Sequence, residues 1–253
     1  MGQIRPPLKT VRRCFETIEV LLESGSAGPT EIADRLDLPK STVHEYLRAL
    51  KSCDYVVQEG QTYRVSYKFL NIGGQLQKQN RVCQVAKPEL RKLARETGHL
   101  VNYNITERSR AIILHQEDGD DSMNVVTYPG LETPLHTHAT GKVLLAHMPE
   151  PEMNGILEAD LSSMTDETIT DPEHLQTEIE RIREQGYAVD WDQRTLGMGF
   201  ASVPIVIDEE LYGAIGLACP TGRLKETDFQ ERIVRKLQET AHTITVNFQW
   251  GTQ

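Results

Sequence analysis

Several features that mark specialised classes of protein are missing from this sequence. No apolar run approaches the ~18 residues that a membrane span needs, and residues 143–146 are typical of the longest runs present. Residues 1–7 lack the apolar core of a secretory signal peptide, and Pro6 stands where an N-myristoylation signal carries Ser or Thr. We therefore expect a cytoplasmic protein that neither crosses nor enters a membrane.

Metal-binding and catalytic signatures are missing as well. The four cysteines, Cys14, Cys53, Cys83 and Cys219, include no pair at the two-residue spacing of zinc knuckles and redox motifs, so we expect reduced thiols. The chain has no Gly-x-Ser-x-Gly elbow and no Walker loop, and residues 197–199 lack the third glycine of a dinucleotide fingerprint. We therefore predict no catalytic residue, no metal ion and no cofactor.

An enzyme is nevertheless an alternative, because the second half of the chain holds groups that can act as bases or ligands. These groups are His115, His136, His138, His147 and Asp190. On a strand His136 and His138 would share one face, but two ligands are too few for a metal site without a third. Helix capping or packing is the expected role of these histidines.

The composition is that of a globular protein with an uneven charge distribution. The 253 residues are 38% hydrophobic and 25% charged, with a mean hydropathy of −0.44, which suits one large domain or two small ones. The formal net charge is −10, but residues 1–80 hold 11 basic and 9 acidic side chains. Because electrostatic fields are local beyond a Debye length of ~8 Å, a slightly basic N-terminal domain on an acidic body can dock on DNA.

The first 65 residues have the pattern of a winged helix-turn-helix. Residues 8–24 predict an amphipathic helix that buries Leu8, Val11, Phe15, Ile18 and Leu22. A second short helix begins at 29–30 and ends at 37–39, and a third begins at 40–41. Residues 55–58 and 62–65 predict a hairpin. The third helix would lie in the major groove, although a polar face that is merely solvated is the alternative.

The remainder predicts an α+β body behind a helical linker. The linker has breaks at 73–74 and Pro88, and we set the domains at 1–68, 69–98 and 99–253. Strands are expected at 100–106, 110–116, 124–128, 201–207 and 211–218, and helices at 139–148, 171–185 and 226–247. Thr170 and Glu173 would form a capping box and Gly186 a C-terminal stop. Helices gathered on one face of an antiparallel sheet suggest a sensor domain with a ligand cleft.

Two groups of motifs resemble the IclR (isocitrate-lyase regulator) family of transcription factors. Residues 31–50, with the core Leu-Pro-Lys-Ser-Thr-Val-His at 38–44, are similar to its DNA-reading domain, and residues 134–146, 185–190, 196–197 and 213–220 to its effector domain. The resemblance implies binding to palindromic operators as a dimer or a dimer of dimers, with the linker contributing to the dimer. The DNA contacts it implies are Lys40, Ser41, Thr42, His44 and Arg48, together with Arg64 of the wing.

Glu45 departs from that pattern, because relatives usually carry a basic or neutral residue there. An acid at this position would be repelled by phosphate or would accept from a cytosine amino group. The alternative is a capping box in which Thr42 and Glu45 satisfy backbone amides at the helix start.

For the second half, the resemblance implies a GAF-like mixed α/β domain that binds a small organic acid. The ligand-binding positions it implies are Val125, Ala139, Thr140, Asp190, Met198, Phe200, Gly216 and Ala218. Free amides at the helix after residues 136–138 favour a carboxylate, whereas Asp190 would repel one unless it accepts a ligand hydroxyl or is protonated by burial. Asp190 in a strand-end turn is the alternative. Gly216 and Ala218 replace the small hydroxyl residues of relatives and Phe200 adds a ring, which favours an aromatic or larger acid.

The sequence thus predicts a ligand-responsive DNA-binding transcriptional regulator that senses a small organic acid, aromatic among the options, of carbon catabolism. It would bind double-stranded DNA at a palindromic operator as a homodimer or a dimer of dimers. The alternatives are a DNA-binding protein whose C-terminal domain only dimerises or binds a protein, and an enzyme or metal-binding domain.

Overall fold

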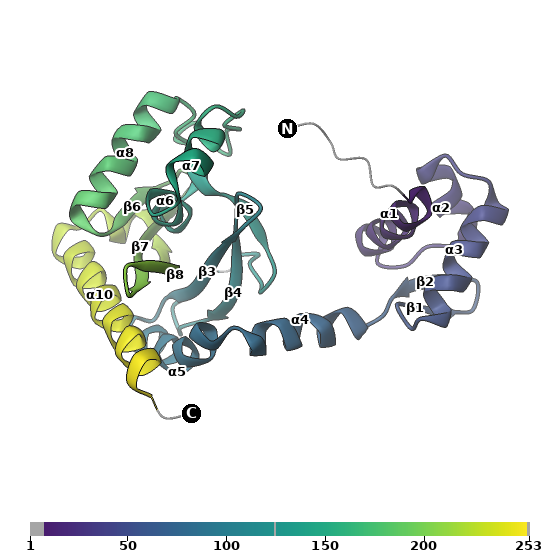
Figure 1. The fold of residues 1–253 in the computed structure, drawn as a ribbon, viewed down its shortest axis with the longest axis horizontal. Coiled ribbons are helices and arrows are strands. Elements are labelled where there is room, and N and C mark those ends of the chain that lie inside the picture. The colour runs from purple at the N-terminus through teal and green to yellow at the C-terminus, as the bar shows by residue number, and fades with distance from the viewer. Residues whose placement is uncertain (1–7, 124, 252–253) are drawn as a thin grey trace. The chain divides into compact units, whose positions relative to one another are not determined.

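The structure, a computed structural model, describes residues 8–123 and 125–251. The chain divides into two compact units, Met1–Leu76 and Gln77–Gln253, whose elements are labelled in Figure 1. The expectations for residues 1–7 and for Asn124 lie outside the described residues. No helix in the described ranges is long and apolar enough to cross a membrane.

The N-terminal unit is a winged helix-turn-helix, as predicted. It consists of α1 (Lys9–Ser24), α2 (Pro29–Leu36), α3 (Lys40–Ser52), β1 (Val56–Glu59) and β2 (Thr62–Val65), and the two strands pair antiparallel. Pro29 occupies the first turn of α2, where its missing N–H costs nothing, and Asp37 ends that helix with a left-handed φ of 51°. Leu21, Ile32, Val43 and Leu47 are fully buried in the core of this unit.

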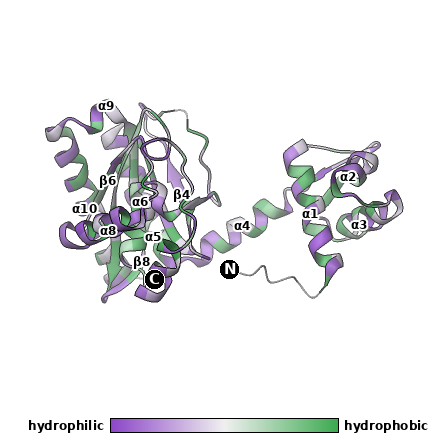
Figure 2. Cartoon of the chain, turned by 90° about the horizontal axis from the view of Figure 1, so that it is seen from above, coloured by the Kyte–Doolittle hydropathy of each residue, from purple (hydrophilic) through white to green (hydrophobic). Residues whose placement is uncertain are grey.

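The predicted buried face of α1 is wrong for four of its five residues. Leu8, Val11, Phe15 and Leu22 are 64%, 46%, 56% and 64% exposed, and only Ile18 of the predicted set is buried, together with Thr17, Val20 and Leu21. Helical spacing shows that residues share a face, but not which face a neighbouring element covers. Here α2 and α3 cover the neighbouring stripe of α1. Figure 2 shows hydrophobic and hydrophilic stretches alternating along α1 and α4.

The linker is helical, as predicted, but its break lies elsewhere. Helix α4 spans Lys68–Gln79 and includes Gly73 and Gly74, and α5 (Arg81–Thr97) continues through Pro88. The chain breaks at Asn80, whose side chain accepts from the Cys83 amide at 2.8 Å and so caps α5. A single N-cap residue therefore decides where one helix gives way to the next.

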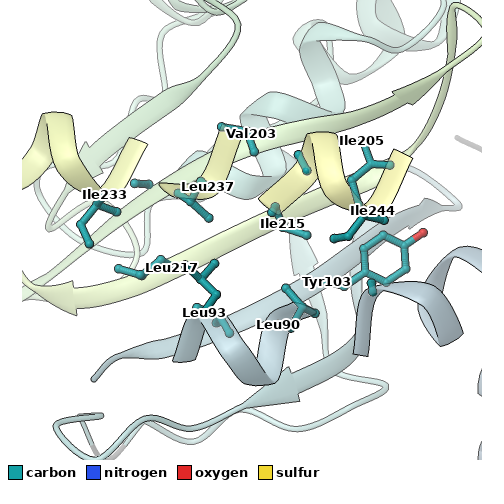
Figure 3. Close-up of a cluster of buried hydrophobic side chains, with 14 of the residues drawn as sticks. Leu90, Leu93, Tyr103, Val203, Ile205, Ile215, Leu217, Ile233, Leu237 and Ile244 are labelled. Atoms are coloured by element: carbon teal, nitrogen blue, oxygen red, sulfur yellow. The ribbon is translucent and has the colours of Figure 1, made fainter. Parts of the chain in front are cut away.

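A six-stranded antiparallel sheet in the order β5-β4-β3-β8-β7-β6 forms the centre of the second unit. Its strands are β3 (Leu100–Glu107), β4 (Arg110–Glu117), β5 (Glu132–Pro134), β6 (Ala188–Trp191), β7 (Met198–Ile207) and β8 (Glu210–Pro220). Helices α5 and α10 (Thr227–Trp250) cover one face. Figure 3 shows Leu90, Leu93, Leu237 and Ile244 from these helices against strand residues such as Tyr103 and Leu217.

Helices cover the other face too, so the expectation that they gather on one face is wrong. The 3-10 turn Leu135–Thr137, α6 (Ala139–Ala146), α7 (Glu150–Leu157) and α8 (Pro172–Gln185) form a second apolar core with Leu100, Ala214, Ala218 and Phe200. Because both faces are covered, six consecutive residues of β7, 198–203, are buried. This second covered face is where the predicted ligand-binding residues lie.

Some elements were missed or displaced. Residues 125–128 form no strand; the strand comes at β5 instead, and β6, α7 and α9 (Thr221–Leu224) were not predicted. The N-cap of α8 is Asp171, which accepts from the His174 amide at 2.8 Å, so the predicted capping box of Thr170 and Glu173 is wrong. Helix α6 ends at Ala146, two residues before its predicted end, whereas Gly186 ends α8 with a φ of 76°, as predicted.

Gly141 holds α6 against the chain that precedes it, and this contact is testable. A Cβ at Gly141 would collide with the Leu135 backbone, whose carbonyl carbon would lie at 2.8 Å, whereas no described atom lies within 4 Å of a Cβ at Gly155 in α7. We expect Gly141→Ala to lower the free energy of unfolding by about 1–3 kcal/mol and Gly155→Ala to raise it by up to ~1 kcal/mol. Equal melting temperatures for the two variants would contradict this packing.

Candidate DNA-reading helix and effector face

Helix α3 presents one polar face to solvent, which we call the reading face. The burial of Val43, Leu47 and Leu50 fixes its orientation. The exposed residues of the reading face are Lys40, Ser41, His44, Glu45 and Arg48, and Thr42 at its edge is half-buried. The helix begins after Pro39 with no side-chain cap, so the alternative of a Thr42–Glu45 capping box is wrong. Both side chains therefore remain available to a partner.

Arg64 of the wing already has a counter-charge. Its Nε donates to Glu59 Oε1 at 2.7 Å across the β1–β2 hairpin, and its guanidinium lies 5.6 Å from the centre of the Tyr67 ring. The pair is partly exposed, with 33% of the Arg64 side chain accessible. A phosphate that approaches Arg64 must therefore compete with Glu59.

The predicted ligand-binding residues lie together on the sheet face under α6. We call this group the effector face. Asp190, Phe200 and Ala218 are neighbours across β6, β7 and β8, and two residues along β8 Gly216 pairs with both Asn102 and Ser202. The apolar cluster that contains Phe200 and Ala218 also contains Ala139 and Met198. Val125 is partly buried and packs against this cluster. Thr140, in the first turn of α6, is 1% exposed.

Asp190 sits within β6 and caps α6, so the alternative of a strand-end turn is wrong. It is fully buried, and its Oδ2 accepts from the Ala139 amide. Burial raises the pKa of this carboxyl to about 7, against the lowering influence of Lys142 and of the amides of Ala139 and Gln193. Its Oδ1 makes no hydrogen bond of good geometry with the described residues, although the Gln193 amide is close enough to lower the pKa of the carboxyl. The Ala139 amide, which the sequence predicted as a donor to a ligand carboxylate, thus already donates to Asp190.

Two cationic side chains that the sequence did not predict as part of this site lie near the carboxyl group. Lys142 is fully buried in α6, and its Nζ donates to Gln193 Oε1. Burial lowers the pKa of Lys142, which Asp190 and Glu178 oppose, and burial likewise lowers the pKa of Arg194, which Asp190 opposes. The sequence signal for a buried cation here was the position of Lys142 inside the largely apolar segment 139–146.

The histidines near this face make packing and hydrogen-bond contacts. The His138 ring meets Phe200 edge-on with centroids 5.9 Å apart, and burial holds the pKa of His138 well below its usual value. The Nε2 atom of His136 lies 2.9 Å from the Ser162 carbonyl oxygen. Within residues 8–123 and 125–251, no group of three His, Cys, Asp or Glu side chains is placed to hold a metal ion.

Gly216 lets polar groups from other elements approach β8. A Cβ at Gly216 would collide with Thr140 Oγ1 and stand 2.9 Å from Asn102 Oδ1. Thr140 Oγ1 is buried without a partner among the described residues, and Asn104 Nδ2 donates to Asn102 Oδ1 at 2.7 Å. The hydroxyl that β8 lacks is therefore supplied from α6, beside a carboxamide from β3.

A helix-turn-helix unit followed by a mixed α/β domain with a buried polar face defines a class of two-domain transcriptional regulators. Two family models match the chain, "IclR helix-turn-helix domain" over residues 10–60 and "Bacterial transcriptional regulator IclR C-terminal" over residues 75–246. The chain belongs to the IclR family of transcriptional regulators, as its motifs predicted.

Individual relatives agree with this assignment. The chain is 31% identical over 255 residues to the transcriptional repressor AllR of Escherichia coli, covering 96% of this chain and 93% of AllR. The crystal structure of the Thermotoga maritima IclR protein matches with a TM-score of 0.80 at 25% identity, over 95% of this chain and 99% of that one. An IclR homologue of Microbacterium hydrocarbonoxydans, complexed with 4-hydroxybenzoate, has the same fold, with a TM-score of 0.82 at 20% identity over 95% and 99% of the two chains. Relatives such as AllR are named as transcriptional regulators, and this corrects the alternative of an enzyme.

Burial of Asp190 predicts a specific pH dependence of stability. Its pKa is about 7 in the folded protein and 3.8 without perturbation, so between these values the folded chain holds a proton that the unfolded chain has released. The contribution of Asp190 to the free energy of unfolding therefore falls as pH rises from about 4 to about 7, and levels off above.

Asp190→Asn should remove this contribution. We expect the difference in unfolding free energy, variant minus wild type, to grow between pH 4 and pH 7, measured by urea unfolding with the fluorescence of the adjacent Trp191 as one probe. The charged groups around the carboxyl, Lys142, Glu178 and Arg194, are unchanged in the variant. A difference that is constant over this range would contradict the prediction.

Proposed function

We propose that this protein is a cytoplasmic, ligand-responsive transcriptional regulator in which α3 reads a palindromic operator and the effector face binds a small organic acid. In this proposal residues 1–68 bind DNA, 69–98 link, and 99–253 sense a metabolite of carbon catabolism. The observation that carries it is the pair of buried oxygens without described partners, Asp190 Oδ1 and Thr140 Oγ1, in a regulator with an exposed reading face. Buried polar atoms that lack protein partners are satisfied by water or ligand.

The surroundings of the effector face favour an anion with an apolar part. Lys142 and Arg194 place two positive charges near Asp190, and Phe200, Met198 and Ala218 form an apolar wall. The complex of the Microbacterium homologue with 4-hydroxybenzoate supports an aromatic acid as one candidate. We propose that the residues of the effector face, with Val125 at its edge, contact the ligand.

Effector binding would act on DNA through the difference in its affinity for two arrangements of the protein. An acid that binds one arrangement of a dimer better than the other shifts the spacing of the two α3 helices against half-sites about one helical turn apart. Binding at the effector face then changes operator affinity without any contact between acid and DNA.

The exposed apolar stripe of α1, made up of Leu8, Val11, Phe15 and Leu22, supports a dimer. These residues are separated by three, four and seven positions, spacings that place them on one face of a helix-pairing seam, which a second copy of the same helix complements. Exposed Leu70 and Leu76 in α4 add apolar surface in the linker. We therefore propose a homodimer, or a dimer of dimers, in which α1 and the linker contribute contacts.

Phe15→Glu tests the seam. Because each dimer would bury two copies of Phe15, and burial of one such side chain contributes about 1.5–3 kcal/mol, we expect the dimer dissociation constant to rise more than tenfold. Thr10→Glu adds the same charge to an exposed position of α1 outside the stripe and serves as the control. Sedimentation equilibrium that gives the same dissociation constant for both variants would contradict the role of α1.

Arg48 tests the reading face. If its guanidinium contacts a base edge, Arg48→Ala weakens binding to the preferred sequence by ~1–3 kcal/mol and leaves binding to a scrambled duplex nearly unchanged. Arg108→Ala removes the same charge from an exposed turn of the C-terminal unit and should change neither affinity. Fluorescence anisotropy titrations that show equal affinity for wild type and Arg48→Ala on the preferred duplex would remove Arg48 from the interface.

The alternative is that the C-terminal unit only dimerises or binds a protein. Thermal shift measurements over a broad library of organic acids separate the two, because an effector that binds only the folded state raises the melting temperature. No shift with any acid would favour the alternative.

A further inference from the structure

Glu45 is the acidic side chain at the centre of the reading face. At about 100° per residue, it lies about 140–160° around α3 from each of the buried residues Val43, Leu47 and Leu50. His44, which is also exposed, lies only about 60–120° from the same three residues. The residue opposite the buried face of a helix projects farthest from the core. Glu45 therefore points to the place where α3 meets a partner.

No neighbouring group neutralises this carboxylate. Four other glutamates of the N-terminal unit form ion pairs with arginines: Glu16, Glu23, Glu31 and Glu59. Arg48 follows Glu45 at the three-residue spacing that gives an ion pair of 2.8 Å between Arg13 and Glu16 in α1. Within residues 8–123 and 125–251, however, the side chains of Glu45 and Arg48 form no ion pair and no hydrogen bond. Both charges are free to meet a partner.

The chemistry of the major groove decides what an acid at this position can bind. Phosphates line the walls of the groove and repel a carboxylate, so Glu45 weakens binding unless a base donates a hydrogen to it. Cytosine N4 and adenine N6 are the donors on the major-groove edges. Beside adenine N6 lies the acceptor N7, which repels the second carboxylate oxygen, whereas beside cytosine N4 lies a C–H group. Cytosine is therefore the base that an ionised Glu45 fits best.

We propose that Glu45 is a specificity-determining residue of α3, which accepts a hydrogen bond from the N4 amino group of a cytosine in each half-site of the operator. This inference rests on the proposed function, because it takes α3 to lie in the major groove. The hydrogen bond stabilises the complex with the correct sequence, and the repulsion by phosphate destabilises complexes with all others. Glu45 thus lowers the overall affinity for DNA and raises the selectivity among sequences.

Base substitutions in the preferred duplex test this inference with the full-length protein. Selection from a random duplex pool with wild type should enrich a two-fold symmetric motif that has a cytosine·guanine pair at one position of each half-site. In fluorescence anisotropy titrations, any other pair at that position should weaken binding by about 5- to 150-fold, the range for one good base contact. N4-methylcytosine, in which a methyl group replaces the groove-facing hydrogen but base pairing is kept, should weaken binding as well.

Two variants of Glu45 remove the acceptor charge without touching the core of α3. Glu45→Ala should reduce the discrimination at that position to less than about twofold, and should bind a scrambled duplex more tightly because the repulsion by phosphate is gone. Glu45→Gln keeps the size of the side chain and should shift the preference toward adenine, which a carboxamide contacts through N6 and N7. Glu184→Gln, the same change at an exposed position of α8, is the matched control and should alter neither affinity.

The outcomes separate the inference from the function on which it rests. A cytosine preference of wild type that Glu45→Ala loses supports the inference. A preference that survives in Glu45→Ala, or a gain in affinity for every duplex with unchanged discrimination, overturns it and leaves the proposed function standing, because other residues of α3 then read the operator. Failure of wild type to enrich any motif contradicts the reading of DNA itself, and the inference with it.

Discussion

The C-terminal unit depends on the fully buried carboxyl group of Asp190 at the first turn of α6. Asp190 accepts from the Ala139 amide and lies near buried Lys142, so β6, α6 and the 192–197 loop are tied to one charged group. Burial of a charge is costly unless partners compensate, which makes this arrangement sensitive to any new hydrogen bond or charge. An acid that binds at the effector face would therefore change the interactions among Asp190, Lys142 and Arg194.

The sheet holds these groups in register. The side chains of Asp190, Phe200 and Ala218 project from adjacent antiparallel strands toward α6, and Gly216 lies on the same face of the sheet. Alternate residues such as Leu217 and Ile215 face α5 and α10. A one-residue slip of any strand would exchange the two sets. The apolar core on the far face therefore fixes the geometry of the effector face from the opposite side of the sheet.

The sequence predicted the helices and long strands well where local signals decide them. Pro29, Gly186 and the apolar spacing of α3 placed their elements correctly, because capping, breaking and periodicity act within a few residues. It failed where distant packing decides. The exposure of Phe15 depends on which stripe of α1 is covered by α2 and α3, and the capping of α6 by Asp190 joins residues 51 positions apart. The burial of Lys142 within an apolar segment could be explained only once its partner Gln193 was known.

The central claim is that this chain reads a DNA sequence as a two-fold dimer, and selection from a random duplex pool tests it most directly. Repeated rounds of binding with the full-length protein, at two salt concentrations and with and without a mixture of short and aromatic acids, should enrich a two-fold symmetric motif with half-sites about one helical turn apart. Retention of DNA that weakens with salt and enriches no motif under any of these conditions would mean that the protein contacts phosphate alone, and would contradict the account.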